Sequence, residues 1–173
     1  MDNNYNTIPE KENVLAGTVG ALLFSLVGGI LWFVLYQFGR LAAISGLVGV
    51  ICSIKGYTFF TKKESLKGII IAIIAALVVL LIAWYLCLAK DVYDAHQEWY
   101  NSGLILSPIS FTESVKTAHL YLEDSEIAGA YLQDLGIGLL LCAVGSASYI
   151  ATAVKRIKLA KEAAQEQPYN DQQ

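Results

Sequence analysis

The chain contains an unbroken run of 26 uncharged residues, from Val14 to Gly39. A helix rises about 1.5 Å per residue, so this run is longer than the hydrocarbon core of a bilayer, which is about 30 Å thick. Gly68–Ala89 and Leu135–Val154 are uncharged runs of 22 and 20 residues and pass the same test. Only 16% of the residues are charged, against roughly a quarter in soluble domains. We therefore expect an all-α, polytopic membrane protein.

A fourth apolar run, Leu41–Ile54, has 14 residues and is short for a span. It is flanked by Arg40 and Lys55, whose long side chains can extend to the interface, and three aromatic residues follow between positions 57 and 60. We predict a second span here, with a re-entrant hairpin as the alternative. Gly39 is the expected turn between spans one and two, because glycine is favoured just after a helix ends.

This interpretation divides the chain into seven parts. The expected parts are a disordered cytoplasmic tail (1–13), a transmembrane hairpin (14–60), a cytoplasmic loop (61–67), a third span (68–90), an outer helical segment (91–134), a fourth span (135–155) and a second cytoplasmic tail (156–173). The outer segment carries eight acidic residues and only Lys116 as a base, so it should attract cations or a basic partner.

The distribution of lysine and arginine predicts the orientation, because both are enriched in cytoplasmic segments. One side of the four-span arrangement carries only Arg40, Lys90 and Lys116. The other carries nine basic residues, namely Lys11, Lys55, Lys62, Lys63, Lys67, Lys155, Arg156, Lys158 and Lys161. We therefore expect both termini in the cytoplasm. Trp32 and Trp84 lie near the outer ends of spans one and three, where tryptophan favours the headgroup region.

Small residues recur at a spacing of four in every span, which places each set on one helical face. Such residues let helix backbones approach closely in lipid. The sets are Ala21, Ser25 and Gly29, with Gly20 beside them; Ser45, Gly49 and Ser53; Gly68, Ala72 and Ala76; and Ala143, Ala147 and Ala151. They predict packing within a four-helix bundle, or alternatively a face for a homo-oligomer.

The spans contain no ionisable residue at mid-depth, which argues against a proton pathway through buried carboxylates. The charges expected at the interfaces are Arg40, Lys55 and Asp134. An ion pair between Arg40 and Asp134 would fix the first hairpin against span four. The alternative is that each side chain extends to the interface without a partner.

Motifs for cofactors, metals or catalysis are lacking in the sequence. The three cysteines, Cys52, Cys87 and Cys142, lie in or beside the spans and their spacing fits neither a disulfide framework nor a metal site. Asp91, Asp94 and Glu98 share a helical face that we expect to be solvated, with a metal site as the alternative. We predict no cofactor and no enzymatic activity, and the net charge of −3 argues against a nucleic-acid partner.

The outer segment carries three helix signals. Span three is expected to continue outward and to end at Asn101–Gly103, where glycine can cap it. Ser110 and Glu113 have the spacing of a capping box, which predicts a second helix with Phe111, Val115, Ala118 and Leu122 on its apolar face. A third helix should begin at Asp124 or Ser125 and continue into span four.

Several glycines and interface residues form a recognisable set: Glu12–Gly17, Gly20–Leu23, Gly28, Trp32, Gln37, Gly39, Lys55–Tyr57 and Lys67–Gly68. In these residues the chain resembles uncharacterised small four-span membrane proteins of Gram-positive bacteria. The resemblance implies a bacterial plasma-membrane protein with the first hairpin described above, and it implies no activity. Some members carry an N-terminal zinc ribbon, which is not expected here because no cysteine precedes Cys52.

These observations favour a non-enzymatic interaction or accessory protein of the membrane. Its partners would be the lipid bilayer and either further copies of the chain or another membrane protein. The alternative is an oligomeric channel or transporter for a small solute or ion.

Overall fold

A computed structural model describes residues 12–38 and 43–165 and is helical in nearly all of them. In this part of the chain, four helices are long and apolar enough to cross a membrane. The elements are α1 (Val14–Gln37), α2 (Ile44–Thr61), α3 (Leu66–Asn101), α4 (Phe111–Thr117), the 3-10 helix η1 (Ala118–Glu123) and α5 (Ser125–Gln165). The expected all-α, four-span fold is confirmed.

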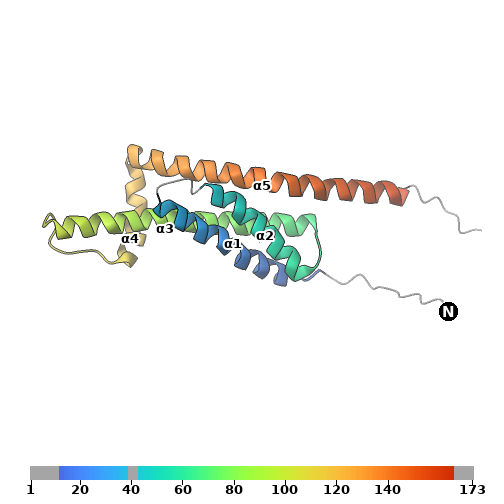
Figure 1. Ribbon diagram of the computed structural model, residues 1–173, viewed down its shortest axis with the longest axis horizontal. Helices are drawn as coiled ribbons and strands as arrows, with labels where there is room; N and C mark the ends of the chain where they lie inside the picture. The colour runs from blue at the N-terminus through green and yellow to red at the C-terminus, as the bar shows by residue number, and fades with distance from the viewer. Residues whose placement is uncertain (1–11, 39–42, 166–173) are drawn as a thin grey trace, which may run out of the picture.

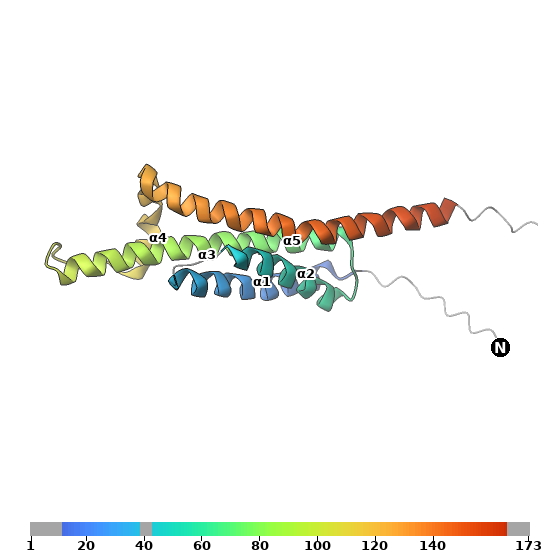
Figure 2. The same ribbon diagram turned by 45° about the horizontal axis from the view of Figure 1, so that its top comes forward.

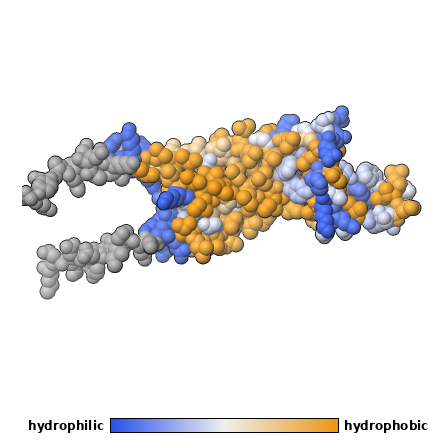
Figure 3. All heavy atoms as spheres, turned by 180° about the vertical axis from the view of Figure 1, so that it is seen from behind, coloured by the Kyte–Doolittle hydropathy of each residue, from blue (hydrophilic) through white to orange (hydrophobic). Residues whose placement is uncertain are grey.

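The long helices lie side by side, with α1, α2 and α3 packed together and α5 along α2 and α3 (Figures 1 and 2). The start of α1 and the end of α5 lie at the same end of the bundle, which we call the tail end. The opposite end, which we call the cap end, holds α4, η1 and the last turns of α3. Hydrophilic residues gather at both ends of an apolar middle (Figure 3), as expected for a molecule that spans a bilayer.

Helix α2 is continuous from Ile44 to Thr61, so the described residues contain a second spanning helix and no break that would make it re-entrant. It ends in a left-handed residue, Lys62, at φ 53°. The predicted turn at Gly39, and with it Arg40, lies outside the described residues. Lys55, expected at the end of the span, lies inside α2 and is exposed.

Helices α1 and α2 meet backbone to backbone. A Cβ atom on Gly28 would lie 2.4 Å from the Cα of Gly49, and one on Gly20 would lie 2.6 Å from the carbonyl oxygen of Gly56. Glycine is required at these positions because any side chain would overlap the facing backbone. This contact brings the two helices closer than larger residues would allow.

Helix α3 is one continuous helix that extends beyond its apolar part, as predicted. The Ser65 side chain caps its start by accepting a hydrogen bond from the backbone N–H of Gly68 at 3.0 Å. At its end, the N–H groups of Gly103 and Leu104 bond to the carbonyls of Tyr100 and Trp99, with Gly103 at φ 75°. This is the Schellman arrangement, which uses glycine for its left-handed residue.

The predicted capping box is present. Ser110 Oγ accepts from the N–H of Glu113, and the Glu113 carboxylate accepts from the N–H of Ser110 at 2.8 Å. The helix that follows is shorter than predicted, because α4 ends at Thr117 and continues as η1. Of the predicted apolar face, Ala118 is buried, whereas Phe111 is 44% exposed.

Helix α5 begins as predicted, with Asp124 Oδ1 accepting from the N–H of Glu126 at 2.9 Å. It continues without a break into span four and on to Gln165. The helix therefore extends past residue 155, where we expected the cytoplasmic tail to follow the span. Leu159 is 54% exposed in this extension, which projects at the tail end.

Replacing Gly28 with alanine should destabilise the bundle, because the added methyl group would overlap the Gly49 backbone. We expect the free energy of unfolding to fall by about 1–3 kcal/mol, the usual cost of overpacking. The measurement is unfolding by SDS in mixed micelles, followed by circular dichroism. Gly136→Ala is the matched control, because nothing lies within 4 Å of a Cβ there. Equal losses in the two variants would contradict the close approach.

Lowering the pH should weaken the start of α4. Hydrogen bonds from the backbone and side chain of Ser110 lower the pKa of Glu113 below its ordinary value. A lowered pKa means that this stabilisation is present above the unfolded-state pKa and is lost as pH falls through the folded-state pKa. We expect hydrogen-exchange protection of Phe111–Thr117 to be lower at about pH 3 than at about pH 6. Glu113→Gln should not show this change, and the same change in that variant would refute the role of the carboxylate.

Candidate functional site

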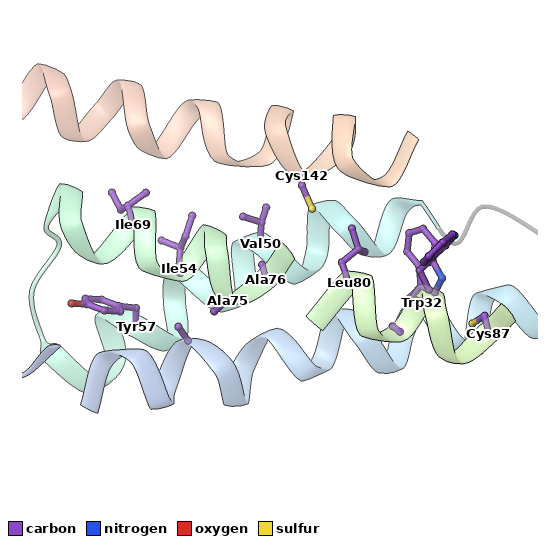
Figure 4. Close-up of a cluster of buried hydrophobic side chains, with 14 residues drawn as sticks. Trp32, Val50, Ile54, Tyr57, Ile69, Ala75, Ala76, Leu80, Cys87 and Cys142 are labelled. Atoms are coloured by element: carbon purple, nitrogen blue, oxygen red, sulfur yellow. The ribbon is translucent and has the colours of Figure 1, made fainter. Parts of the chain in front are cut away.

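The interior of the bundle is closed by the small residues that the sequence singled out. The buried members of the predicted sets are Gly20, Ala21, Ser25, Ser45, Gly49, Ser53, Gly68, Ala72 and Ala76, and Gly29 is half-buried. The cavity among Ser25, Ser45 and Cys142 has a volume of only about 10 Å³, so it holds at most one water molecule. Figure 4 shows the larger apolar side chains filling the space between the helices.

Ser53 joins three helices at the centre of the bundle. Its Oγ lies 2.7 Å from the carbonyl oxygen of Ala72 in α3 and 3.1 Å from that of Ala21 in α1. The hydroxyl has one proton to donate, so the two carbonyls share it. This buried polar group is satisfied within the protein and lines no water path.

The fourth predicted set does not pack within the chain. Ala143 and Ala147 are exposed, whereas α5 buries Gly138, Cys142 and Gly145. The reason is the rotation of α5, which is set by two close contacts. A Cβ on Gly138 would lie 2.6 Å from the Trp32 ring, and Cys142 Sγ lies 3.1 Å from the carbonyl oxygen of Gly46.

The signal for the observed face of α5 was present in the sequence. Gly138, Cys142, Gly145 and Tyr149 follow the spacing i, i+4, i+7, i+11, which lies on one side of a helix. The set that begins at Ala143 has an equally regular helical spacing. Which of the two faces of α5 becomes buried therefore depends on the helices that pack against it.

The two tryptophans were predicted to lie at the headgroup level, but both side chains are buried inside the protein. Trp32 is 0% exposed and Trp84 is 9% exposed. The Trp84 indole N–H donates to the Tyr131 carbonyl at 2.9 Å, which fastens α3 to α5. The Trp32 N–H has no hydrogen-bond partner within the described residues. The Trp32 ring fills the space beside Gly138 of α5.

Asp91 is the centre of a polar cluster that joins α1, α3 and α5 near the cap end. The Tyr36 hydroxyl donates to Asp91 Oδ2 at 2.6 Å, and the Tyr131 hydroxyl donates to the same oxygen. The prediction that Asp91 belongs to a solvated face was wrong, because α1 and α5 cover it. Asp94 instead pairs with Lys90 on α3. The missed signal was the spacing of seven between Trp84 and Asp91, which puts both on the buried face.

The remaining interface charges are apart from these contacts. Asp134 is exposed on α5. Its predicted partner Arg40 is not among the described residues, so the ion pair between them stays a prediction.

Cys52 is half-buried, and Cys87 and Cys142 are buried; all three are free thiols. The described residues hold no group of three side chains that could bind a metal ion.

A groove of about 510 Å³ opens at the tail end, where α5 separates from α2 and α3. Its apolar wall includes Ile54 and Ile69, and its polar groups include Tyr149 and Thr152. At its mouth the guanidinium of Arg156 pairs with the carboxylate of Glu64. A second groove, of about 280 Å³ between α1 and α3, is lined almost entirely by apolar side chains such as Phe33 and Ile82.

Comparison with known protein families, curated proteins and solved structures finds no match to this chain. The resemblance to small membrane proteins of Gram-positive bacteria therefore stays a prediction. The site with the most distinct chemistry is the tail-end groove, which combines apolar walls with charges at its mouth.

Removing the hydroxyl of Tyr36 or of Tyr131 should destabilise the protein, because each donates to Asp91. We expect Tyr36→Phe and Tyr131→Phe each to lower the free energy of unfolding by about 1–3 kcal/mol. The double variant should deviate from additivity, since both hydroxyls share one acceptor oxygen. Tyr93→Phe on α3 is the control, because the described residues provide its hydroxyl with no hydrogen bond. An equal loss of unfolding free energy in Tyr93→Phe would contradict a stabilising role for the two hydrogen bonds to Asp91.

Proposed function

We propose that this chain is a non-enzymatic interaction or accessory protein of the bacterial plasma membrane, with both termini in the cytoplasm. The observation that carries the proposal is the closed interior. Glycine contacts, the Ser53 hydrogen bonds and a central cavity of about 10 Å³ leave no room for a solute to pass through one molecule.

The distribution of charge supports the proposed orientation. At the tail end, the described residues beyond the apolar spans include Lys62, Lys63, Lys67, Lys155 and Arg156. The cap end carries mainly acidic residues. Basic residues favour the cytoplasmic side, so the tail end is the side that we assign to the cytoplasm.

Helix α5 has the most surface left for a partner. In its apolar stretch 22% of the residues are buried, against 44% in α2. Ala143 and Ala147 stay exposed there. The partner would be another membrane protein or a second copy of the chain, and a path for solutes would require such an assembly.

Flux measurements test this function against the competing one, an oligomeric channel or transporter. Purified protein is reconstituted into liposomes, and the efflux of potassium ions and of a small neutral solute is followed. We expect no flux above that of protein-free liposomes, because the interior is closed.

The mass of the protein in detergent is determined on the same preparation, so that oligomers are recognised. Liposomes treated with a known ionophore show that the assay detects flux. Protein-dependent flux that grows with the fraction of oligomer would overturn the proposal in favour of a channel or transporter.

A further inference from the structure

The tail-end groove has the form of a lipid site between helices. Helix α5 is held against the bundle by Cys142 at mid-length, and toward the tail end it separates from α2 and α3. The walls of the opening are aliphatic, from Ile54, Leu66, Ile69, Ala153 and Ile157. The lining passes from these aliphatic residues to the charged Arg156 and Glu64, so it can take an acyl chain together with its polar headgroup.

The mouth of the groove has the groups that bind a phospholipid headgroup. Arg156 presents a guanidinium that can donate two parallel hydrogen bonds to a phosphate. Its present partner Glu64 holds it weakly, since the two side chains are 66% and 53% exposed. The Tyr149 hydroxyl, also in the groove, makes no hydrogen bond within the described part of the chain.

The charge around the mouth selects the class of lipid. Lys63, Lys67, Lys155 and Lys158 lie on the segments that border the groove, and Lys158 pairs with Glu162. Glu12 also lies beside the groove, where it accepts a hydrogen bond from Ser65. With Arg156, five basic groups therefore face the three carboxylates of Glu12, Glu64 and Glu162. Basic pockets between transmembrane helices are typical sites for anionic headgroups. A zwitterionic headgroup would bring an ammonium group into this field and lose part of the attraction.

We propose that this groove binds one anionic phospholipid from the leaflet at the tail end, with its phosphate on Arg156 and one acyl chain along Ile54 and Ile69. Headgroup hydroxyls, as in phosphatidylglycerol, can donate to Glu64 when the ion pair opens, so both charges keep a partner. The site stands apart from the proposed function, because a conducting protein could hold the same lipid.

Native mass spectrometry of the full-length protein in detergent tests the site, with phosphatidylglycerol and phosphatidylcholine added in parallel. We expect the protein to retain one phosphatidylglycerol, and phosphatidylcholine much less. Arg156→Gln should weaken retention at least about tenfold, because a neutral amide would replace the guanidinium and its two charge-assisted hydrogen bonds. Lys155→Gln is the matched control for the general charge at the mouth, because it removes the same charge one residue away, outside the groove lining. It should weaken retention much less than Arg156→Gln does.

A second variant tests the acyl-chain site without changing charge. Ala153→Leu narrows the groove and should also reduce phosphatidylglycerol retention. Circular dichroism checks that Ala153→Leu and Arg156→Gln remain folded. The proposal is overturned if Arg156→Gln and Lys155→Gln lower retention equally, which indicates attraction to the general charge. It is also overturned if the two lipids are retained equally, or if folded Ala153→Leu retains phosphatidylglycerol as the wild type does.

Discussion

The close approach of the α1 and α2 backbones at Gly28 and Gly49 is the contact on which the rest of the bundle depends. Apolar side chains gain little by leaving lipid for one another, so helices in a bilayer associate through close packing and internal hydrogen bonds. Here glycine lets the α1 and α2 backbones pack closely, and the Ser53 hydroxyl of α2 hydrogen-bonds to backbone carbonyls of α1 and α3. The result is a compact three-helix unit with no passage through it.

Helix α5 joins this unit through a backbone contact and through side chains. A Cβ on Gly46 would lie 2.5 Å from the carbonyl oxygen of Gly138, so the α2 and α5 backbones also approach closely. The Trp32 ring lies against Gly138, and the Trp84 indole N–H donates to the Tyr131 carbonyl. Asp91 adds a polar connection that joins α1, α3 and α5. These contacts lie toward the cap end and the middle. Toward the tail end Tyr149 and Ala153 pack only partly against the core, and the groove lies beside them.

The sequence predicted the features that depend on one helix at a time. Run lengths predicted three of the four spans, and the residues that flank the fourth apolar run predicted α2. The capping box and Gly103 predicted helix ends, and spacing predicted small residues such as Ala21 and Ala72 on buried faces. Features that depend on the rotation of one helix against another were missed. The exposed Ala143 face, the buried Trp32 and the tyrosines around Asp91 belong to this class, and so does the groove, which exists only because two helices diverge.

The two halves of α5 are held against the bundle by contacts of different kinds. Two indoles and a carboxyl group shared by two tyrosines hold its first half. In its second half Tyr149 and Ala153 pack partly against the core, and Arg156 forms a solvent-exposed ion pair with Glu64. Local opening costs least where contacts are few and exposed. The turns of α5 around Arg156 are therefore the part of this helix that can open at least cost, and their displacement would change the width of the groove before it disturbed the three-helix unit.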